Sequence, residues 1–356
     1  MIIIATISKN SYGADKIEEI IRAGADVLRY NFSHGNPEEM REKIAVAREV
    51  IERLGLNGKV RILADLPGGK IRLGMIEAAA VVGKPQDAWH LLQVNAGEEY
   101  VFKSGSTSKT QHEFIPVDYP DIGTLAHVGG VAVIADGEIA FEILEITGKD
   151  SFRARALNSF HIPVLKGINF GSAIDEVDHI TDTTIGHIRE LIQIAPEMIA
   201  FSFVNSAEYL KKARRLLSEH GIDLNTVTII SKIESPRGLE NIDEIVDESD
   251  MVMVARGDLG LTTPIEELGL AQKKIIAAAR CGGKPSIVAT MILNSVVTNF
   301  VPSRAEVLDL TNIVLDGADG IMLAKETGLS LTPGFSVSIA RRIIDAVKNS
   351  VQTVSS

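Results

Sequence analysis

Two apolar runs in the second half of the chain end in the same arrangement of charges. In each, a basic residue is followed two positions later by an acidic one, Lys232 by Glu234 and Arg256 by Asp258. A buried strand that delivers a cation and a carboxylate at its C-terminal end stabilises a core poorly but suits a site for a metal ion and a phosphate. After Arg256, Gly257 removes side-chain bulk where backbone N–H groups could approach a carboxylate. The alternative is a surface ion pair just past each strand.

The elements that would position these residues repeat along most of the chain. Short aliphatic runs alternate with stretches of helical periodicity, three runs early and five late. Eight parallel strands separated by helices are typical of a (β/α)8 (TIM) barrel in the α/β class, whose site forms where the strands end. The expected strands are 2–6, 27–31, 60–65, 198–203, 227–232, 251–255, 286–290 and 320–323, and the expected helices are 13–23, 37–54, 209–220, 265–281, 304–316 and 336–347.

The central stretch breaks this rhythm. Between residues 74 and 165 the chain carries short β-rich runs separated by Gly and Asp turns. This pattern predicts a small all-β domain inserted after the third barrel strand, so that residues 1–73 and 166–356 form the catalytic barrel. A domain tethered at both ends beside the catalytic face can act as a lid that excludes water. An inert insertion is the alternative.

Composition narrows the classes of function. A chain of 356 residues that is 45% hydrophobic can bury the core of one barrel with an insertion. Its net charge of −11 argues against a nucleic-acid or anionic-membrane partner. The single cysteine, Cys281, excludes an intramolecular disulfide and fits a reducing cytoplasm. The first six residues lack a basic flank and are too few for a signal sequence or a membrane span, so a cytoplasmic protein is expected.

The barrel would bring polar residues from several strand ends into one mouth. Glu234 and Asp258, from neighbouring strands, can hold Mg²⁺ or Mn²⁺ through hard oxygens and leave positions for water and substrate. Arg29, Arg72 and Lys232 supply the positive charge that stabilises a phosphoryl group during transfer. The residues therefore indicate a site for phosphate, carboxylate and a divalent metal.

These residues resemble the pyruvate kinase family over nearly the whole barrel. The resemblance implies a magnesium-dependent phosphotransferase that uses phosphoenolpyruvate or pyruvate with ADP or ATP. It also implies that the insertion is the family's mobile lid, with landmarks at 135–137 and 166–169. The matching motifs, in the family's order and spacing, are 31–35, 231–234, 253–260, 271–273, 304–306 and 314–318.

The resemblance also implies roles for single residues. Lys232 matches the residue that stabilises the phosphoryl group in flight, and Glu234 and Asp258 match the divalent-metal ligands. Thr290 matches a contact of the substrate carboxylate, where Gly257 also lies. The residues that match the phosphate and nucleotide contacts are Arg29, Asn31, His34 and Arg72, and those that match the monovalent-cation pocket are Asn31, Ser33, Asp65 and Leu66.

One loop bears on the monovalent cation. Family members with Glu in the third-strand loop need K⁺, whereas those with Lys at that position can work without it. Here Lys70 occupies that position. An ammonium near Asp65 and the phosphate site can supply the charge that bound K⁺ otherwise provides. We therefore expect that K⁺ is not required; a solvated Lys70 is the alternative.

The chain also departs from the family's pattern. Thr183 stands where a nucleotide-contacting lysine is expected, which removes a charged hydrogen bond. Ala324 lacks the hydroxyl thought to help protonate the enolate, and Lys325 adds a cation beside it. The segments 8–11 and 289–293 also differ from the family's residues. These changes surround the nucleotide and the proton-delivery step, while the metal and phosphate residues match.

Two further expectations follow from the resemblance. The family's C-terminal domain, which carries the sugar-phosphate effector site and part of the tetramer interface, has no match in these residues. We therefore expect no sugar-phosphate regulation, and any homo-oligomer would form through the barrel.

The leading interpretation is phosphoryl transfer between phosphoenolpyruvate, or a close analogue, and ADP. The alternatives are another Mg²⁺-enolate enzyme, such as a phosphoenolpyruvate hydrolase or a 2-oxo acid lyase, and a silent binding or regulatory relative.

Overall fold

The computed structural model describes residues 1–33, 37–82 and 89–355, and the chain forms two compact units. The first unit comprises Met1–Gly68, His179–Leu259 and Glu266–Ser356, and the second comprises Gly69–Asp178 and Gly260–Ile265. The insertion limits expected at 74 and 165 lie inside the second unit. Backbone hydrogen bonds such as Leu73 N to Lys166 O (2.8 Å) tie the two connecting segments together there.

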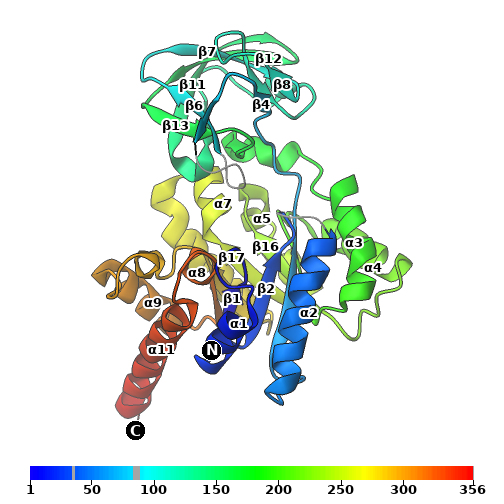
Figure 1. Cartoon of the computed structure of the whole chain (residues 1–356), viewed down its shortest axis with the longest axis vertical. Coiled ribbons are helices and arrows are strands. Elements are labelled where there is room, and N and C mark those ends of the chain that lie inside the picture. The colour runs from blue at the N-terminus through cyan, green and yellow to red at the C-terminus, as the bar shows by residue number, and fades with distance from the viewer. Residues whose placement is uncertain (34–36, 83–88, 356) are drawn as a thin grey trace. The chain divides into compact units, whose positions relative to one another are not determined.

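The first unit is a closed barrel of parallel strands in the order β1-β19-β18-β17-β16-β15-β3-β2, enclosed by helices (Figure 1). This confirms the predicted barrel. Each strand begins and ends within two residues of its predicted limits. The strands are β1 (Ile2–Thr6), β2 (Val27–Asn31), β3 (Arg61–Leu66), β15 (Met198–Phe201), β16 (Thr228–Ile233), β17 (Met251–Ala255), β18 (Ser286–Ala289) and β19 (Gly320–Leu323).

The helices follow amphipathic stretches. In α1 the buried residues Ile17, Ile20 and Ile21 recur at helical spacing and form one apolar face. A capping box between Ser303 and Glu306 begins α9, where the sequence predicted a helix. The helices are α1 (Ala14–Arg22), α2 (Pro37–Arg53), α3 (Asp182–Ile194), α4 (Ala207–Glu219), α5 (Pro236–Glu240), α6 (Ile242–Glu248), α7 (Arg256–Thr262), α8 (Leu268–Cys281), α9 (Arg304–Asp316), α10 (Lys325–Gly328) and α11 (Pro333–Ser355).

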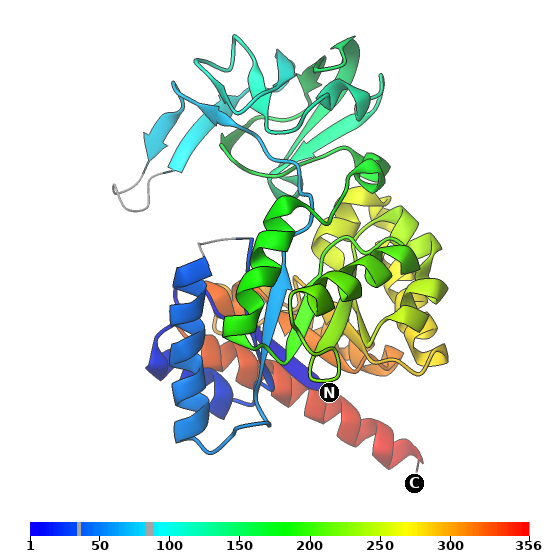
Figure 2. The ribbon, with the colours of Figure 1, turned by 90° about the vertical axis from the view of Figure 1, so that its right-hand side faces the viewer.

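Several helical features differ from the expectation: α5, α6, α7 and α10 were not predicted, and α11 extends beyond the predicted 336–347 at both ends. Helix α3 was not predicted; it begins at a capping box between Thr181 and Thr184 and runs beside α2 (Figure 2). The predicted helix 265–281 is a short 3-10 turn, Ile265–Glu267, followed by α8. No helix among the described residues is long and apolar enough to cross a membrane.

The barrel has two hydrophobic layers. Alternate strand residues, including Ile4, Leu63, Ile230 and Met253, pack inside the barrel, and their neighbours pack between the strands and the surrounding helices. Because side chains alternate along a strand, every second residue of a barrel strand points inward and forms an inward row. The polar residues of the site lie at the next positions of these inward rows.

In its described part, the second unit is built from β-strands and short 3-10 turns, together with residues 260–262 at the end of α7. A six-stranded sheet has the order β14-β10-β11-β12-β7-β9, and smaller sheets pair β13-β6-β5 and β4-β8. Phe102, Phe141 and Phe152 are fully buried and in ring contact. The strands are β4 (Met75–Ile76), β5 (Ala80–Val82), β6 (Trp89–Val94), β7 (Glu99–Ser104), β8 (Thr107–Ser108), β9 (Ile115–Val117), β10 (Val131–Ile134), β11 (Ile139–Gly148), β12 (Ser151–Ala156), β13 (Phe160–Pro163) and β14 (Ile168–Asn169).

Candidate active site

The charged residues of the site extend the inward rows of the barrel strands. Lys232 lies two positions after the inward residue Ile230 on β16, and Asp65 lies two positions after Leu63 on β3. A period of two therefore turns both side chains into the barrel, where the apolar layer ends. Arg29 continues the row of β2 in the same way. The strand pattern thus places opposite charges from separate strands in one buried cluster.

Lys232 lies at the centre of this cluster. Its Nζ contacts Asp65 Oδ1 at 3.2 Å and Glu234 Oε1 at 3.1 Å, and it donates a hydrogen bond to Ser202 Oγ at 2.8 Å. Arg29 contacts the other oxygen of Asp65, with Nη2 to Oδ2 at 2.7 Å. The Asp65 carboxylate is therefore held between two cations and is 1% exposed.

The neighbours of Lys232 and Asp65 favour the charged form of both groups. Burial alone would lower the pKa of Lys232, but the Asp65 and Glu234 carboxylates outweigh burial and raise that pKa above its usual range. Burial would raise the pKa of Asp65, but Lys232 and Arg29 hold it below its usual range. The cluster thus favours a charged ammonium in a place nearly closed to water.

The pKa of Glu234 is set by a different combination of effects. Its Oε2 accepts a hydrogen bond from the backbone N–H of Phe203 at 2.7 Å. Burial raises the pKa of Glu234, Lys232 opposes this, and the nearby Asp258 and Asp65 carboxylates raise it further. A buried carboxylate beside a second carboxylate is stabilised when a divalent cation binds both. Among the described residues, no three His, Cys, Asp or Glu side chains form a metal-binding group by themselves.

Arg256 does not pair with Asp258 as Lys232 pairs with Glu234. Its guanidinium donates to the carbonyl oxygens of Thr290 (2.7 Å from Nη2) and Met291 (3.0 Å), and Nη1 contacts Asp309 Oδ2 on α9 at 2.7 Å. The alternative of an ion pair within each segment therefore does not hold for Arg256 and Asp258. Arg256 instead links the end of β18 to the outer helix layer.

Thr290 follows β18 in a left-handed backbone conformation, with φ of 71°. Its Oγ1 is buried and has no hydrogen-bond partner among the described residues. A Cβ placed on Gly257 would lie 3.5 Å from this oxygen, so Gly257 and Thr290 are neighbours. A buried hydroxyl without a partner, beside the first turn of α7, is available to a ligand.

The residues matched to the monovalent pocket take part in other contacts. Asn31 Oδ1 accepts the backbone N–H of Ser33 at 3.1 Å, and the carbonyl oxygen of Leu66 accepts the hydroxyl of Ser202 at 2.8 Å. The Asp65 carboxylate is bound by Lys232 and Arg29. His34 lies outside the described residues.

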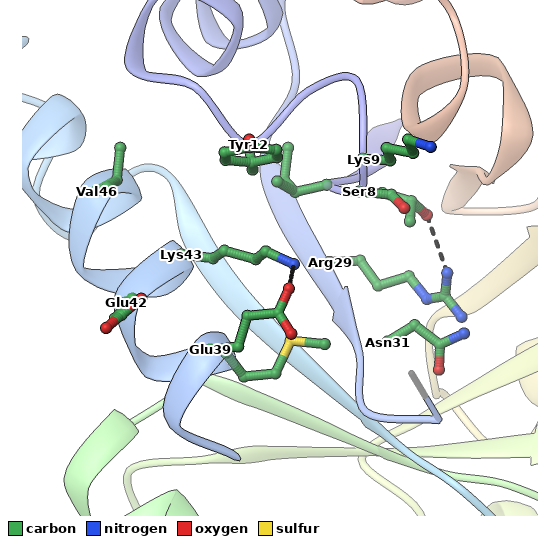
Figure 3. A pocket seen from close by; sticks show the side chains of 12 residues that line it. Ser8, Lys9, Tyr12, Arg29, Asn31, Glu39, Glu42, Lys43 and Val46 are labelled. Carbon is green, nitrogen blue, oxygen red and sulfur yellow. Dashed lines mark hydrogen bonds and ion pairs between the residues drawn. The ribbon is translucent and has the colours of Figure 1, made fainter. Parts of the chain in front are cut away.

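A cavity of about 650 Å³ opens beside Arg29 and Asn31 (Figure 3). Its wall comes from the segment after β1 and from α2. Lys43 contacts Glu39 at 2.5 Å and lies 5.6 Å from the centre of the Tyr12 ring. The cavity therefore adjoins the charged cluster at Arg29 and is lined by cationic, acidic and aromatic side chains, among them Lys43, Glu42 and Tyr12.

Other predicted residues have surroundings of their own. Arg72 and Lys70 belong to the second unit, where Arg72 Nη1 donates to the carbonyl of Leu165 at 3.4 Å and the Lys70 side chain packs against Gly167. Thr183 is exposed on the first turn of α3. Ala324 precedes α10, and Lys325 is exposed on its first turn.

Ser202 was missed from the sequence, although it contacts Lys232. The signal was its position in the row of Met198 and Ala200, both of which point into the barrel. Glu326 lies in α10, shortly after the end of β19. Its buried carboxylate accepts the backbone N–H groups of Ile292 and Leu293, each at 3.0 Å.

Comparison with known proteins places this arrangement in a family. Residues 1–337 match the family described as "Pyruvate kinase, barrel domain". The chain belongs to the pyruvate kinase family. Pyruvate kinase of Thermococcus litoralis is 35% identical over 341 residues, which cover 96% of this chain and 68% of that protein. Human pyruvate kinase PKLR is 34% identical, over 96% of this chain and 58% of its own length.

A solved structure agrees with the sequence matches. The crystal structure of a pyruvate kinase from Cryptosporidium parvum aligns with a TM-score of 0.87 at 31% identity. The alignment covers 98% of this chain and 69% of that one. The chain thus spans roughly three fifths to two thirds of the length of these relatives. The family resemblance seen in the motifs is confirmed.

Proposed function

We propose that this protein transfers a phosphoryl group between phosphoenolpyruvate and ADP. The observation that carries the proposal is the Lys232 ammonium, buried at the end of a barrel strand and held by Asp65, Glu234 and Ser202. A fixed cation in a nearly dry site stabilises the charge on a phosphoryl group in transfer, because it need not reorient during the reaction. A lysine with this environment is costly to maintain for stability alone.

Each neighbour of Lys232 has a task in this proposal. Asp65 and Ser202 fix the direction of the ammonium, and Arg29 adds a second positive charge to the phosphate side of the cluster. Because the pKa of Lys232 is raised, it stays protonated and acts as a charge, not as a base. The proton that converts an enolate to pyruvate must come from another group or from water.

Glu234 and Asp258 would hold Mg²⁺ or Mn²⁺. The structure supports this fit because the pKa of Glu234 is raised by burial and by Asp258, so a bound cation would relieve the crowding of negative charge. When bound, the metal supplies Lewis-acid charge to the substrate oxygens. Lys232 offsets part of the negative charge of Glu234. Asp258 would be the second carboxylate that binds the metal.

Thr290 and Gly257 would recognise the substrate carboxylate. The Thr290 hydroxyl is buried without a partner and lies beside Gly257, in the first turn of α7. Backbone N–H groups in the first turn of a helix have no partner within the helix, so they can bind an anion together with the hydroxyl. The carboxylate would then lie between the ends of β17 and β18.

ADP would enter through the cavity beside Arg29 and Asn31. Lys43 and Tyr12 offer a cation and a ring to a nucleotide (Figure 3). Arg29 lines the same cavity and contacts Asp65 of the Lys232 cluster. We also assign Arg72 and His34 to the nucleotide phosphates and the inserted β domain to the role of lid, on the family resemblance. Thr183 replaces a lysine there, so nucleotide affinity should be lower than in relatives that carry the lysine.

A second function is favoured by one observation. Thr183, exposed on the first turn of α3, stands where a lysine that contacts the nucleotide is expected. If ADP is held weakly, water could accept the phosphoryl group of phosphoenolpyruvate at the same cluster and leave inorganic phosphate and the enolate of pyruvate. This alternative shares Lys232, Glu234 and Asp258 and differs only in the acceptor.

One assay separates the two functions. Purified protein is mixed with phosphoenolpyruvate and Mg²⁺, with and without ADP, and ATP, pyruvate and inorganic phosphate are measured. The proposal expects ATP and pyruvate in equal amounts, only when ADP is present. Phosphate release without ADP would support the hydrolase, and the absence of all products under both conditions would reject both.

A further inference from the structure

The turn after β18 has an unusual backbone. Thr290 and Met291 are consecutive residues other than glycine, and both have positive φ, 71° and 52°. L side chains disfavour this conformation, and the branched Cβ of threonine disfavours it most. Such strain persists only where surrounding contacts overdetermine the backbone. The contacts that do so here are visible on both sides of the turn.

Arg256 binds the carbonyl side of the turn. Its Nε and Nη2 contact the carbonyl oxygen of Thr290 at 3.2 and 2.7 Å, and Nη2 also contacts the carbonyl of Met291 at 3.0 Å. The same guanidinium is held from α9 by Asp309 at 2.7 Å and from α8 by Gln272 at 3.3 Å. A planar fork can make these contacts at once, whereas a single ammonium cannot.

Glu326 binds the amide side. One carboxylate oxygen accepts the backbone N–H groups of Ile292 and Leu293, each at 3.0 Å. The other accepts the N–H of Ala324 at 2.8 Å, which ties the turn to β19. Glu326 is only 1% exposed, so these three bonds form away from solvent. The turn therefore lies between a cation on its carbonyls and an anion on its amides.

We propose that Arg256 and Glu326 are positioning residues that hold Thr290 in its left-handed conformation and so set the affinity for the substrate carboxylate. We call Arg256 and Glu326, with their hydrogen bonds to residues 290–293, the clamp. Its consequence is the placement of the Thr290 hydroxyl. Thr290 Oγ1 stays buried and without a partner beside Gly257, although a relaxed backbone would let it turn to a protein partner or to water. The carboxylate role of Thr290 rests on the proposed function; the clamp itself does not.

The test of the substrate effect is a double-mutant cycle. Arg256→Met should raise the KM for phosphoenolpyruvate at least about tenfold, as expected for a lost hydrogen bond to a charged group, while the KM for ADP changes less than about twofold. Arg256→Lys should recover only part of the loss, since it keeps the charge without the fork. In a Thr290→Val background, Arg256→Met should change the KM for phosphoenolpyruvate less than about twofold, because the hydroxyl it positions is gone.

Arg214→Lys serves as the matched control. Arg214 also joins a backbone carbonyl, that of Glu248, to an aspartate, Asp250, but its contacts lie away from β18. This control should leave both KM values unchanged. Equal rises in the KM for ADP and phosphoenolpyruvate in Arg256→Met, or additive effects with Thr290→Val, would overturn the substrate part of the proposal.

Hydrogen–deuterium exchange tests the clamp without any substrate. Arg256→Lys and Glu326→Gln should each speed exchange of the Ile292 and Leu293 amides at least about tenfold, while amides of β16 keep wild-type rates. Unchanged exchange at both amides would overturn the clamp. If the wild type shows neither phosphoryl transfer nor phosphoenolpyruvate binding, the proposed function fails, but the exchange result still decides the clamp. Asp309→Asn, which removes only the outer partner of Arg256, provides a milder variant if the others do not fold.

Discussion

The segments 232–234 and 256–258 carry the same charge pattern but serve different purposes. Lys232 and Glu234 face one another at 3.1 Å inside a buried cluster. Arg256 turns away from Asp258 and binds the carbonyls of the next strand's turn. In the proposed function, the first segment would supply charge to the reacting group, and the second would hold the backbone that positions Thr290 for the substrate.

The difference comes from where each strand ends. Strand β16 continues to Ile233, so Lys232 lies on extended backbone and Glu234 follows directly. Strand β17 ends at Ala255, and α7 begins at Arg256. Two residues apart on a helix means a rotation of about 200°, which directs Arg256 and Asp258 to different sides. A change of periodicity from strand to helix thus separates two side chains that the sequence pattern appeared to pair.

Replacing Lys232 gives the largest expected effect and tests the comparison most directly. Lys232→Met should lower kcat at least about 10³-fold while phosphoenolpyruvate still binds, because a preorganised charge acts mainly on the transition state. Arg256→Met should instead act mainly on KM. Steady-state kinetics and direct binding measure both quantities. A kcat within tenfold of wild type would remove Lys232 from the mechanism.

The two aspartates that hold these cations should differ in their contribution to stability. Asp65→Asn leaves Arg29 and Lys232 with less compensating charge in a buried place and should lower the free energy of unfolding by about 3–5 kcal/mol. Asp309→Asn removes a partner that is 34% exposed and should cost about 1 kcal/mol or less. Urea unfolding of both variants gives the comparison. Equal losses of unfolding free energy would mean that Asp65 and Asp309 contribute equally to stability, and would contradict this comparison.

The fold could be predicted because each barrel strand is a short aliphatic run with its own boundaries. The strand Met251–Ala255 was predicted to the residue, and the helix Arg304–Asp316 likewise. Helix α3 was missed because it begins with threonines, Thr181 and Thr184, whose capping bonds are visible only in three dimensions. Short strands in the second unit, such as Met75–Ile76, are too brief to show periodicity.

The site was predicted in part. Lys232, Glu234 and Asp65 meet as expected because alternation along a strand fixes which face they share. The direction of Arg256 could not be predicted, since the residue before α7 is Ala255, which gives none of the usual signals of a helix start. The left-handed backbone of Thr290 also leaves no mark in a Thr-Met sequence.

Substitution of the two proposed metal ligands tests whether Glu234 of the first segment and Asp258 of the second bind one metal ion together. Glu234→Gln and Asp258→Asn should each weaken Mg²⁺ or Mn²⁺ binding at least about tenfold, because each removes one anionic oxygen ligand. Calorimetric titration with Mn²⁺ in the presence of phosphoenolpyruvate measures the change. Arg214→Lys should bind as the wild type does. Wild-type affinity in both ligand variants would refute the assignment of these carboxylates to the metal.

Substitution of Lys70 has the smallest expected effect. It tests whether activity at the Lys232 cluster requires bound K⁺. The position of Lys70 matches the one where family members carrying Glu require K⁺, so we expect full activity in a buffer free of K⁺ and Na⁺. In Lys70→Glu, added K⁺ should raise activity severalfold, about tenfold at most, because one unit charge is exchanged for another. Lys149→Glu, a charge reversal at an exposed lysine in the turn between β11 and β12, is the matched control and should not create a K⁺ response. If the wild type is inactive until K⁺ is added, Lys70 does not replace the cation, and Asn31, Ser33, Asp65 and Leu66 would then be the residues to examine for a K⁺ site.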